Sequence, residues 1–236
     1  PQGVDIKTSP PSLMGDAIKA GEIDAFCVGE PWGSIAVENG VGELLLPGSA
    51  IWSFAPEKVL AVRSDWAEQE TALVGRLIRS VSRAGRWLAD PSSRILRSEL
   101  FVRPGYINMS YDILDRSFVG RLVISKAGVE RSVDQFMEFN KGAACFPWRS
   151  QAEWIGGQLA ARLGLDRPAA LAAAGAVFRS DIYRAAHAGT TTDMPGASSK
   201  IEGAVEASMA VASESGQIIL QPNRFFDGRV FEPTLG

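Results

Sequence analysis

The residues best suited to binding chemistry lie in one stretch, EIDAFCVGEPWGSIAVENG, at residues 22–40. A thiol, a glycine, an acid and an indole follow one another there as Cys27, Gly29, Glu30 and Trp32. A glycine lets the backbone approach a ligand closely, and the first turn of a helix offers free N–H groups and partial positive charge to an anion. The stretch therefore predicts a site for a small oxyanion, with a purely structural strand-to-helix junction as the alternative.

The carboxylate of Glu30 works against an anion site unless a cation neutralises it. Lys58, in the segment PEKVL, is one candidate for that cation. An opposite charge within a few ångströms favours the ionised form of a carboxyl group. The sequence therefore makes a pair between Glu30 and a cation such as Lys58 the condition for oxyanion binding.

The elements around this stretch alternate between helix and strand. The segment PPSLMGDAIKAG predicts one helix, and a second helix begins near Pro31 and ends before Gly40. Between them, residues 23–28 are predicted to form a buried strand, which would bring the site residues to the carboxyl edge of a sheet, where open α/β folds bind ligands. Further strands are predicted at residues 43–46 and 59–63, which gives an α/β pattern.

The rest of the chain is predicted to be mostly helical. Apolar residues recur at helical spacing over residues 70–89, and the other side carries a row of arginines: Arg76, Arg79, Arg83 and Arg86. Beside Glu68 and Glu70 this row is typical of a solvated face, with phosphate binding as the alternative. The remaining predicted elements are, in chain order, helices at 92–102, 111–118, 132–139, 150–163 and 169–186, a loop at 187–200, a helix at 201–212, an apolar run at 218–220 and a turn at 227–228.

The composition is that of a folded chain with no sign of a nucleic-acid or membrane partner. Its 236 residues are 46% hydrophobic, which is enough for a substantial core. The formal net charge of −3 gives no basic character for binding a phosphate backbone, so no nucleic acid is expected. No apolar run approaches the roughly 18 residues that cross a bilayer.

Catalysis has little support in the sequence. His187 is the one histidine, and its place at the end of a predicted helix is typical of a side chain that caps carbonyls or faces water. No GxSxG, HExxH, P-loop or GxGxxG motif is present, and no catalytic residue is predicted. Cys27 and Cys145 belong to no CxxC pair or Cys/His cluster, so neither a disulfide framework nor a metal site is expected, and no cofactor either. The alternative of an acid–base enzyme is kept only because the sequence has many carboxylates that could act as acid or base.

Four segments in order carry a resemblance to a known family. They are GEIDAFCVGEPWGSIAVENGVG, IWSFAPEKVLAV, FPWRSQAEWIGGQLAARLG and FFDGRVFEP. Together they resemble the nitrate- and bicarbonate-binding proteins of the nitrate/taurine class of ABC importers, and the related cytoplasmic nitrate sensors that partner an antiterminator. The resemblance spans about residues 10–233 and implies an α/β architecture of the periplasmic-binding-protein type II kind, in which two α/β lobes close on a ligand.

The resemblance also implies that the N-terminal third of this fold is missing from the chain. Residues 1–50 would then form the C-terminal half of lobe two, and residues 51–236 the hinge and the remainder of lobe one, largely helical. Unpaired sheet edges and exposed apolar faces would invite a second copy, so a homodimer is one expected assembly. Any secretion signal or lipid anchor of the parent protein would lie upstream of Pro1.

The family's pattern transfers to a few positions of this chain. Its strand-to-helix signature, expected to form part of the cleft wall, is matched by Cys27, Gly29, Glu30, Pro31 and Trp32. Lys58 stands where a relative's anion-contacting lysine could lie, and a charge-assisted hydrogen bond to nitrate is worth about 1.5–3 kcal/mol. The alternative for Lys58 is a surface lysine near a turn.

Other positions carry less of the pattern or depart from it. Arg149 could line the cleft or the contact between lobes, while Phe146 and Trp148 are expected to pack inside one lobe. Ala55 stands where many relatives have a histidine, and Ser53 where transporters often carry a lysine. These departures weaken a direct transfer of nitrate specificity, and the APEK form is closer to the sensor branch.

The resemblance implies a protein that binds a small inorganic anion without catalytic turnover. Nitrate or nitrite is the first choice and bicarbonate the second, held by the solute-binding component of an ABC transporter that docks on its permease. One alternative is a cytoplasmic nitrate sensor that controls a regulatory antiterminator. A second is an enzyme like the thiamin-precursor synthases, which share the fold and use a histidine-bearing active site. An importer would be periplasmic or membrane-anchored, and a sensor cytoplasmic.

Overall fold

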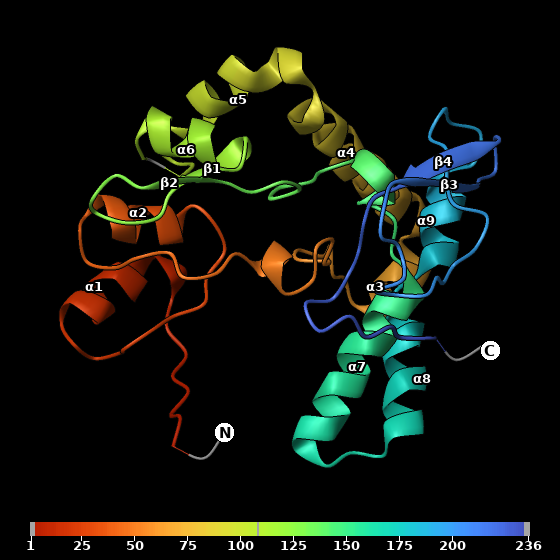
Figure 1. The fold of residues 1–236 in the computed structure, drawn as a ribbon. Coiled ribbons are helices and arrows are strands. Elements are labelled where there is room, and N and C mark those ends of the chain that lie inside the picture. The colour runs from red at the N-terminus through yellow and green to blue at the C-terminus, as the bar shows by residue number, and fades with distance from the viewer. Residues whose placement is uncertain (1–2, 108, 234–236) are drawn as a thin grey trace. The chain divides into compact units, whose positions relative to one another are not determined.

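The protein is described by a computed structural model that covers residues 3–107 and 109–233 (Figure 1). Contacts within the chain divide it into two units. Unit 1 comprises residues 1–47 and 94–137, and unit 2 comprises residues 48–93 and 138–236. Each unit is thus built from two separate stretches of sequence. The assignment of residues 1–50 and 51–236 to the two lobes of a complete fold stays a prediction.

Unit 1 is a small assembly of short helices and one hairpin. Its strands β1 and β2 pair antiparallel with Leu122 opposite Arg131. Figure 1 shows α2 between α1 and the hairpin, with α6 on the hairpin's other side. Its elements are the 3-10 turn η1 (Pro11–Leu13), α1 (Met14–Lys19), α2 (Trp32–Glu38), α5 (Arg94–Phe101), α6 (Tyr111–Phe118), β1 (Arg121–Val123) and β2 (Glu130–Ser132).

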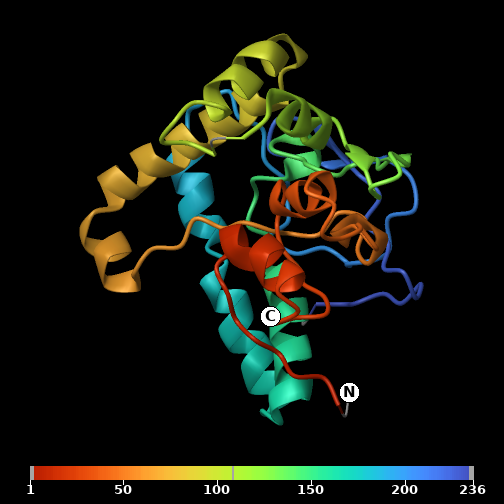
Figure 2. The same ribbon diagram turned by 90° about the vertical axis from the view of Figure 1, so that its left-hand side faces the viewer.

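Unit 2 is larger and mostly helical. Helices α7 and α8 run side by side in both views of the ribbon (Figures 1 and 2). They approach closely because a Cβ atom added at Gly156 would lie 2.6 Å from the Cβ of Ala174. The elements are η2 (Gly48–Ala50), α3 (Ser64–Gln69), α4 (Thr71–Ala89), η3 (Pro91–Ser93), η4 (Lys141–Ala143), α7 (Arg149–Leu163), α8 (Arg167–Val177), α9 (Ser180–His187), β3 (Met209–Ala212) and β4 (Gln217–Leu220).

The core of unit 2 joins residues that are distant in sequence. One buried cluster consists of Phe146, Trp148, Met194 and Leu220. A second group stacks three aromatic rings, Trp52, Trp154 and Phe225, with centroids 4.8–5.1 Å apart. Aromatic rings bury the largest apolar areas of any side chain, so these two groups fix the N-terminal half of α7 against the C-terminal segment. Phe146 and Trp148 therefore pack in the core, as the sequence predicted.

Several helices agree with the sequence prediction. Helix α6 has the predicted bounds, and α7 begins one residue before its predicted start. Helices α1 and α2 form on either side of the site stretch, and Gly40 after α2 has the positive φ, 66°, that favours glycine. Among the described residues no helix is both long enough and apolar enough to cross a bilayer.

Three predicted helices differ in the structure. The helix predicted at 169–186 is two helices, because Phe178 and Arg179 have extended ψ angles of 94° and 71° that break the hydrogen-bond ladder. The helix predicted at 132–139 is replaced by the end of β2 and a series of turns, with Gln135 at a φ of 54°. The helix predicted at 201–212 does not form. The end of that segment is strand β3, which pairs with the apolar strand β4.

Helix α4 buries a different face from the predicted one. Val74 is buried, but Leu77 and Val81 are 36% and 45% exposed. The buried positions are mostly small residues, because Gly75 meets α9 and Gly85 meets the loop before η4. Hydrophobic periodicity cannot identify a contact that depends on the absence of side chains.

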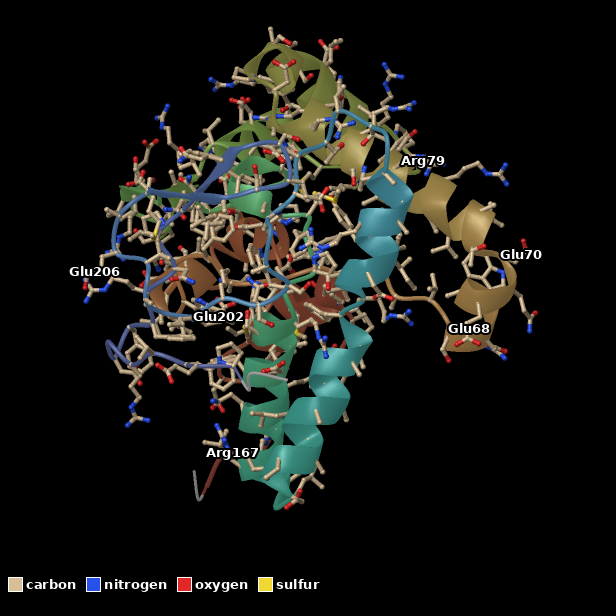
Figure 3. The ribbon with its side chains drawn as sticks, turned by 90° about the vertical axis from the view of Figure 1, so that its right-hand side faces the viewer. Glu68, Glu70, Arg79, Arg167, Glu202 and Glu206 are labelled. Atoms are coloured by element: carbon tan, nitrogen blue, oxygen red, sulfur yellow. The ribbon has the colours of Figure 1, made fainter. Side chains whose placement is uncertain are left out.

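The arginine row on α4 is only partly a solvated face. The Arg79 guanidinium donates to the Ala186 carbonyl at 2.7 Å, and Arg86 donates to Thr192 Oγ1 at 3.3 Å. Figure 3 shows Arg79 beside α9, with Glu70 just before the start of α4 and Glu68 in α3. Arg79 and Arg86 therefore tie α4 to neighbouring backbone and loop, while Arg76 and Arg83 are exposed.

The structure contradicts the three strands predicted around the site. Residues 23–28, 43–46 and 59–63 belong to no strand in the part of the chain that the structure describes. A strand needs a ladder of hydrogen bonds to a neighbour. Residues 43–46 make a single such bond, from the Leu44 N–H to the Ile124 carbonyl at 2.9 Å.

The burial predicted for residues 23–28 is also wrong, because none of these residues is buried and Cys27 is exposed. The other two segments are exposed as well. Leu45 is 90% exposed, Val59 61% and Leu60 47%. These segments are extended chain with apolar side chains in contact with solvent. The site residues consequently lie at a loop-to-helix junction and not at the edge of a sheet.

Candidate functional site

Glu30 lies at the start of α2 and accepts two hydrogen bonds from Ser34. The Ser34 N–H donates to Oε2 at 3.3 Å and the Ser34 hydroxyl to Oε1 at 2.8 Å. Burial raises the pKa of the Glu30 carboxyl, and the two Ser34 bonds oppose that rise. The protein's own carboxylate therefore occupies the first turn of α2, where the sequence predicted an external anion.

The predicted pairing of Glu30 with Lys58 stays a prediction, because the two residues belong to different units. Lys58 pairs with the adjacent Glu57 at 2.6 Å, and the two side chains are 80% and 65% exposed. Glu30 belongs to unit 1, and Lys58 belongs to unit 2. Lys58 has the environment of a surface lysine near a turn, and its contact with an anion stays a prediction.

Trp32 lines a cavity of about 470 Å³ within unit 1. Helices α1 and α2 lie side by side and supply most of its walls (Figure 1). The side formed by η1 and α1 contributes Pro11, Ser12, Gly15, Asp16 and Lys19, and the side formed by α2 and the following turn contributes Trp32, Ile35, Asn39 and Val41. An indole, aliphatic side chains, a hydroxyl, an amide, one cation and one acid thus surround a space large enough for a small ligand.

The other predicted site residues lie outside this cavity wall. Cys27 is exposed, and Gly29 is half-buried next to Glu30. The close packing behind Glu30 involves Gly33, where an added Cβ would lie 2.9 Å from the Leu44 side chain. Gly33, the residue after Trp32, therefore packs against Leu44, while Trp32 lines the cavity.

His187 has a different environment from the predicted one. It is 2% exposed, and its Nε2 lies 3.0 Å from the hydroxyl of Ser82 on α4. The Tyr183 hydroxyl lies 3.4 Å from the same Ser82 oxygen. Burial lowers the pKa of His187, and Arg86 and Arg79 lower it further. His187 thus joins α9 to α4 as a buried neutral imidazole, and it lines neither of the two best-formed cavities.

Sequence reasoning missed a buried polar network in unit 2. Glu202 is fully buried and accepts hydrogen bonds from Ser150 at 2.6 Å and Asn223 at 3.1 Å, together with an ion pair from Lys200. Lys200 also lies 5.4 Å from the centroid of Trp148. Figure 3 shows Glu202 near the N-terminal end of α7. No spacing rule joins these residues, because Ser150 and Glu202 are 52 positions apart.

The chain is similar in sequence to several known proteins. Residues 1–100 match the model of the NMT1-like family. The nitrate/nitrite binding protein NrtA of Synechocystis sp. is 26% identical over 237 residues, which are 95% of this chain and 47% of that protein. NrtA of Synechococcus elongatus is 28% identical over 151 residues, or 64% of this chain and 34% of that protein. The nitrate import ATP-binding protein NrtC of Synechocystis sp. is 30% identical over 71% of this chain, which covers 25% of that protein.

The fold is decided by a solved structure. The crystal structure of the periplasmic nitrate-binding protein NrtA from Synechocystis PCC 6803 superposes with a TM-score of 0.81 at 21% sequence identity. The match covers 98% of this chain and 58% of that one. The predicted resemblance is confirmed. The chain has the α/β fold of the periplasmic-binding-protein type II class, and it spans between a quarter and about half of the curated relatives named above.

Proposed function

We propose that the chain is part of a solute-binding protein that holds nitrate or nitrite for an ABC transporter. The observation that carries this proposal is the NrtA-like fold, which extends over 98% of the chain. The named relatives are nitrate-binding proteins or components of nitrate import, which favours binding over catalysis. Bicarbonate is the second candidate anion, because bicarbonate transport ATP-binding proteins are among the relatives, at 33–35% identity over about half of the chain.

The mechanism follows from the two-lobed architecture. A ligand that binds the closed form more tightly shifts the protein toward closure, and the closed form is what a permease recognises. We assign the seam at Gly29, Glu30 and Trp32 to the wall of the ligand site. Its support is local: Gly33, next to the seam, packs against Leu44, and Trp32 borders a cavity lined by a hydroxyl, an amide, a cation and an acid. Cys27 and Lys58 complete the proposed set of ligand-binding residues.

A nitrate sensor is the second candidate, favoured by one position. Ser53 stands where transporters often carry a lysine, and in the structure its hydroxyl donates to the Pro222 carbonyl at 3.1 Å while its N–H bonds to the Arg224 carbonyl at 2.9 Å. The residue therefore has a structural role here. A sensor would keep the same anion site and pass its closure to a regulatory protein in the cytoplasm, whereas an importer would be periplasmic or membrane-anchored.

An enzyme like the thiamin-precursor synthases has less support. That chemistry requires a histidine in the active site, and His187 is buried between α4 and α9. We therefore expect the protein to bind its ligand without turning it over.

A chimera tests the proposal, because the chain spans only part of its relatives. Residues 1–236 replace the structurally matched part of Synechocystis NrtA, and the product is checked for cooperative unfolding. Thermal unfolding is then followed with nitrate, nitrite, bicarbonate, a sulfonate and a pyrimidine at constant ionic strength. We expect nitrate or nitrite to raise the unfolding temperature most. Stabilisation by the pyrimidine alone would replace the binding proposal with the enzyme alternative.

A further inference from the structure

A second cavity, of about 520 Å³, lies within unit 2 and is lined by three arginines. It opens where the N-terminal ends of α7 and α9 meet the C-terminal end of α8. We name it the arginine pocket after Arg149, Arg179 and Arg184. Asp181 is the one acid among the described residues that line it, so the lining side chains carry a net charge of about +2.

Two of the three arginines are held in place by acids. Arg179 makes two hydrogen bonds to Asp181, at 2.8 and 2.7 Å. Arg184 donates to Glu214 at 2.6 Å and to the Ala197 carbonyl at 3.0 Å. Its guanidinium also lies 4.9 Å from the centroid of the Phe146 ring. These contacts fix the two side chains and leave little of their charge uncompensated.

Arg149 supplies the uncompensated charge of the pocket. Its Nε donates to the Gly175 carbonyl at 3.2 Å, which orients the guanidinium without neutralising it. None of the ion pairs given for the described residues involves Arg149. Its two terminal amino groups are thus available for the paired hydrogen bonds that a guanidinium makes to an oxyanion.

We propose that the arginine pocket binds a phosphate dianion, either free or on a small organic phosphate. A cavity of this volume exceeds what nitrate needs and falls in the range of small-molecule sites. A preorganised guanidinium recognises phosphate bidentately, and the charge of Arg149 favours an anion in the pocket. The pocket belongs to unit 2, whereas the seam and cavity of the proposed nitrate site belong to unit 1, so this inference goes beyond the proposed function.

Calorimetric titration of the 236-residue protein tests the proposal. The probes are inorganic phosphate and glycerol 3-phosphate, with chloride holding the ionic strength constant. We expect saturable binding at one site, weakened about tenfold by Arg149→Gln because one charge-assisted bidentate contact is lost. The matched control is Arg167→Gln, which removes an exposed arginine of the same unit at the far end of the α7 and α8 pair (Figure 3). Tighter binding of glycerol 3-phosphate would identify an organic phosphate as the occupant, and equal binding would identify free phosphate.

Three results would overturn the inference. They are the absence of saturable binding, equal weakening by the control variant, and displacement of phosphate by nitrate at matched ionic strength. If Arg149→Gln does not fold, as judged by circular dichroism, amide hydrogen exchange of the unmodified protein decides. Phosphate must then slow exchange at residues 180–182 more than at residues 167–171, and equal exchange rates with and without phosphate would contradict the proposal.

Discussion

Units 1 and 2 differ in the hydrogen-bond partners of one acid in each, Glu30 and Glu202. In unit 2, Glu202 is fully buried and accepts from a hydroxyl and an amide of two distant segments, and it pairs with the Lys200 ammonium two residues away. In unit 1, Glu30 precedes α2 and is half-buried, and among the described residues its side chain bonds to Ser34, four residues further along in α2. Glu202 holds distant segments together, whereas Glu30 organises one helix start.

This difference indicates where ligand binding can occur. A polar group whose hydrogen bonds are all made inside the protein stabilises the fold and has no capacity left for a ligand. A group with local partners only, next to a cavity and extended chain, keeps that capacity. The comparison therefore separates the buried polar network around Glu202 in unit 2 from the candidate site of unit 1.

The largest effect is expected from removing the acid of the buried network. Glu202→Ala leaves the Lys200 ammonium buried without its ion-pair partner, and breaking a buried pair in this way costs about 3–5 kcal/mol. Urea unfolding of the variant measures the loss. Glu206→Ala is the matched control, because that side chain is 76% exposed and lies 3.8 Å from Arg224, so a change of about 0.5 kcal/mol or less is expected. Equal losses of stability in the two variants would contradict a structural role for Glu202.

A pair of glycine substitutions sharpens the comparison between units. At Gly85 in unit 2 an added Cβ would lie 2.6 Å from the Phe139 carbonyl oxygen, so Gly85→Ala should destabilise by about 1–3 kcal/mol. At Gly15 in α1 nothing lies within 4 Å of the added Cβ, so Gly15→Ala should stabilise by up to about 1 kcal/mol through helix propensity. Thermal unfolding of both variants shows whether each substitution raises or lowers stability. Destabilisation by Gly15→Ala would contradict the open space around Gly15 in unit 1.

The two units should respond to acid in opposite directions. Burial lowers the pKa of His187 below its ordinary 6.5, so its contribution to stability is present above pH 6.5 and is lost as the pH falls toward its folded-state pKa. Burial raises the pKa of Glu30 above its ordinary 4.5, so its contribution is present at low pH and is lost as the pH rises through the folded-state value. Urea unfolding of the protein and of His187→Gln at about pH 7 and about pH 5 measures this. The variant should lose less stability on acidification, and identical losses would contradict a buried neutral imidazole.

The smallest effect on stability is expected at an exposed apolar residue of unit 1. Leu45 is 90% exposed, so Leu45→Ser should change the free energy of unfolding by about 0.5 kcal/mol or less. The same substitution should reduce self-association if exposed apolar chain draws two copies together. Light scattering of both proteins reports the assembly, and a monomeric unsubstituted protein would remove the homodimer prediction.

The fold was predictable where local sequence decides it. Glycine after a periodic apolar segment ends α2, and Asp166 caps α8 through the Ala169 N–H at 2.9 Å. Strands were not predictable, because a strand forms only with a paired neighbour and residues 59–63 have none among the described residues. The break between α8 and α9 at Phe178 was also invisible, since an alanine-rich segment satisfies helix propensity throughout.

The candidate site was only partly predictable. The seam of Gly29, Glu30 and Trp32 could be located from residue type and from resemblance, and Trp32 does border a cavity. The partner of the Glu30 side chain could not be predicted from the sequence. A half-buried carboxyl takes the nearest donor, and that donor is the Ser34 hydroxyl in the first turn of α2. The arginine pocket was equally hidden, because α7 and the start of α9 meet only in the folded unit.

Fluorine NMR of the chimera labelled with fluorotryptophan tests the central claim most directly. Nitrate is titrated at constant ionic strength, and the Trp32 resonance is assigned with Trp32→Phe, with Trp87→Phe as the control for a half-exposed indole of unit 2. The account predicts a saturable shift of the Trp32 resonance and no change at Trp87. Saturable nitrate binding that leaves the Trp32 resonance unmoved would contradict the assignment of this seam to the ligand site.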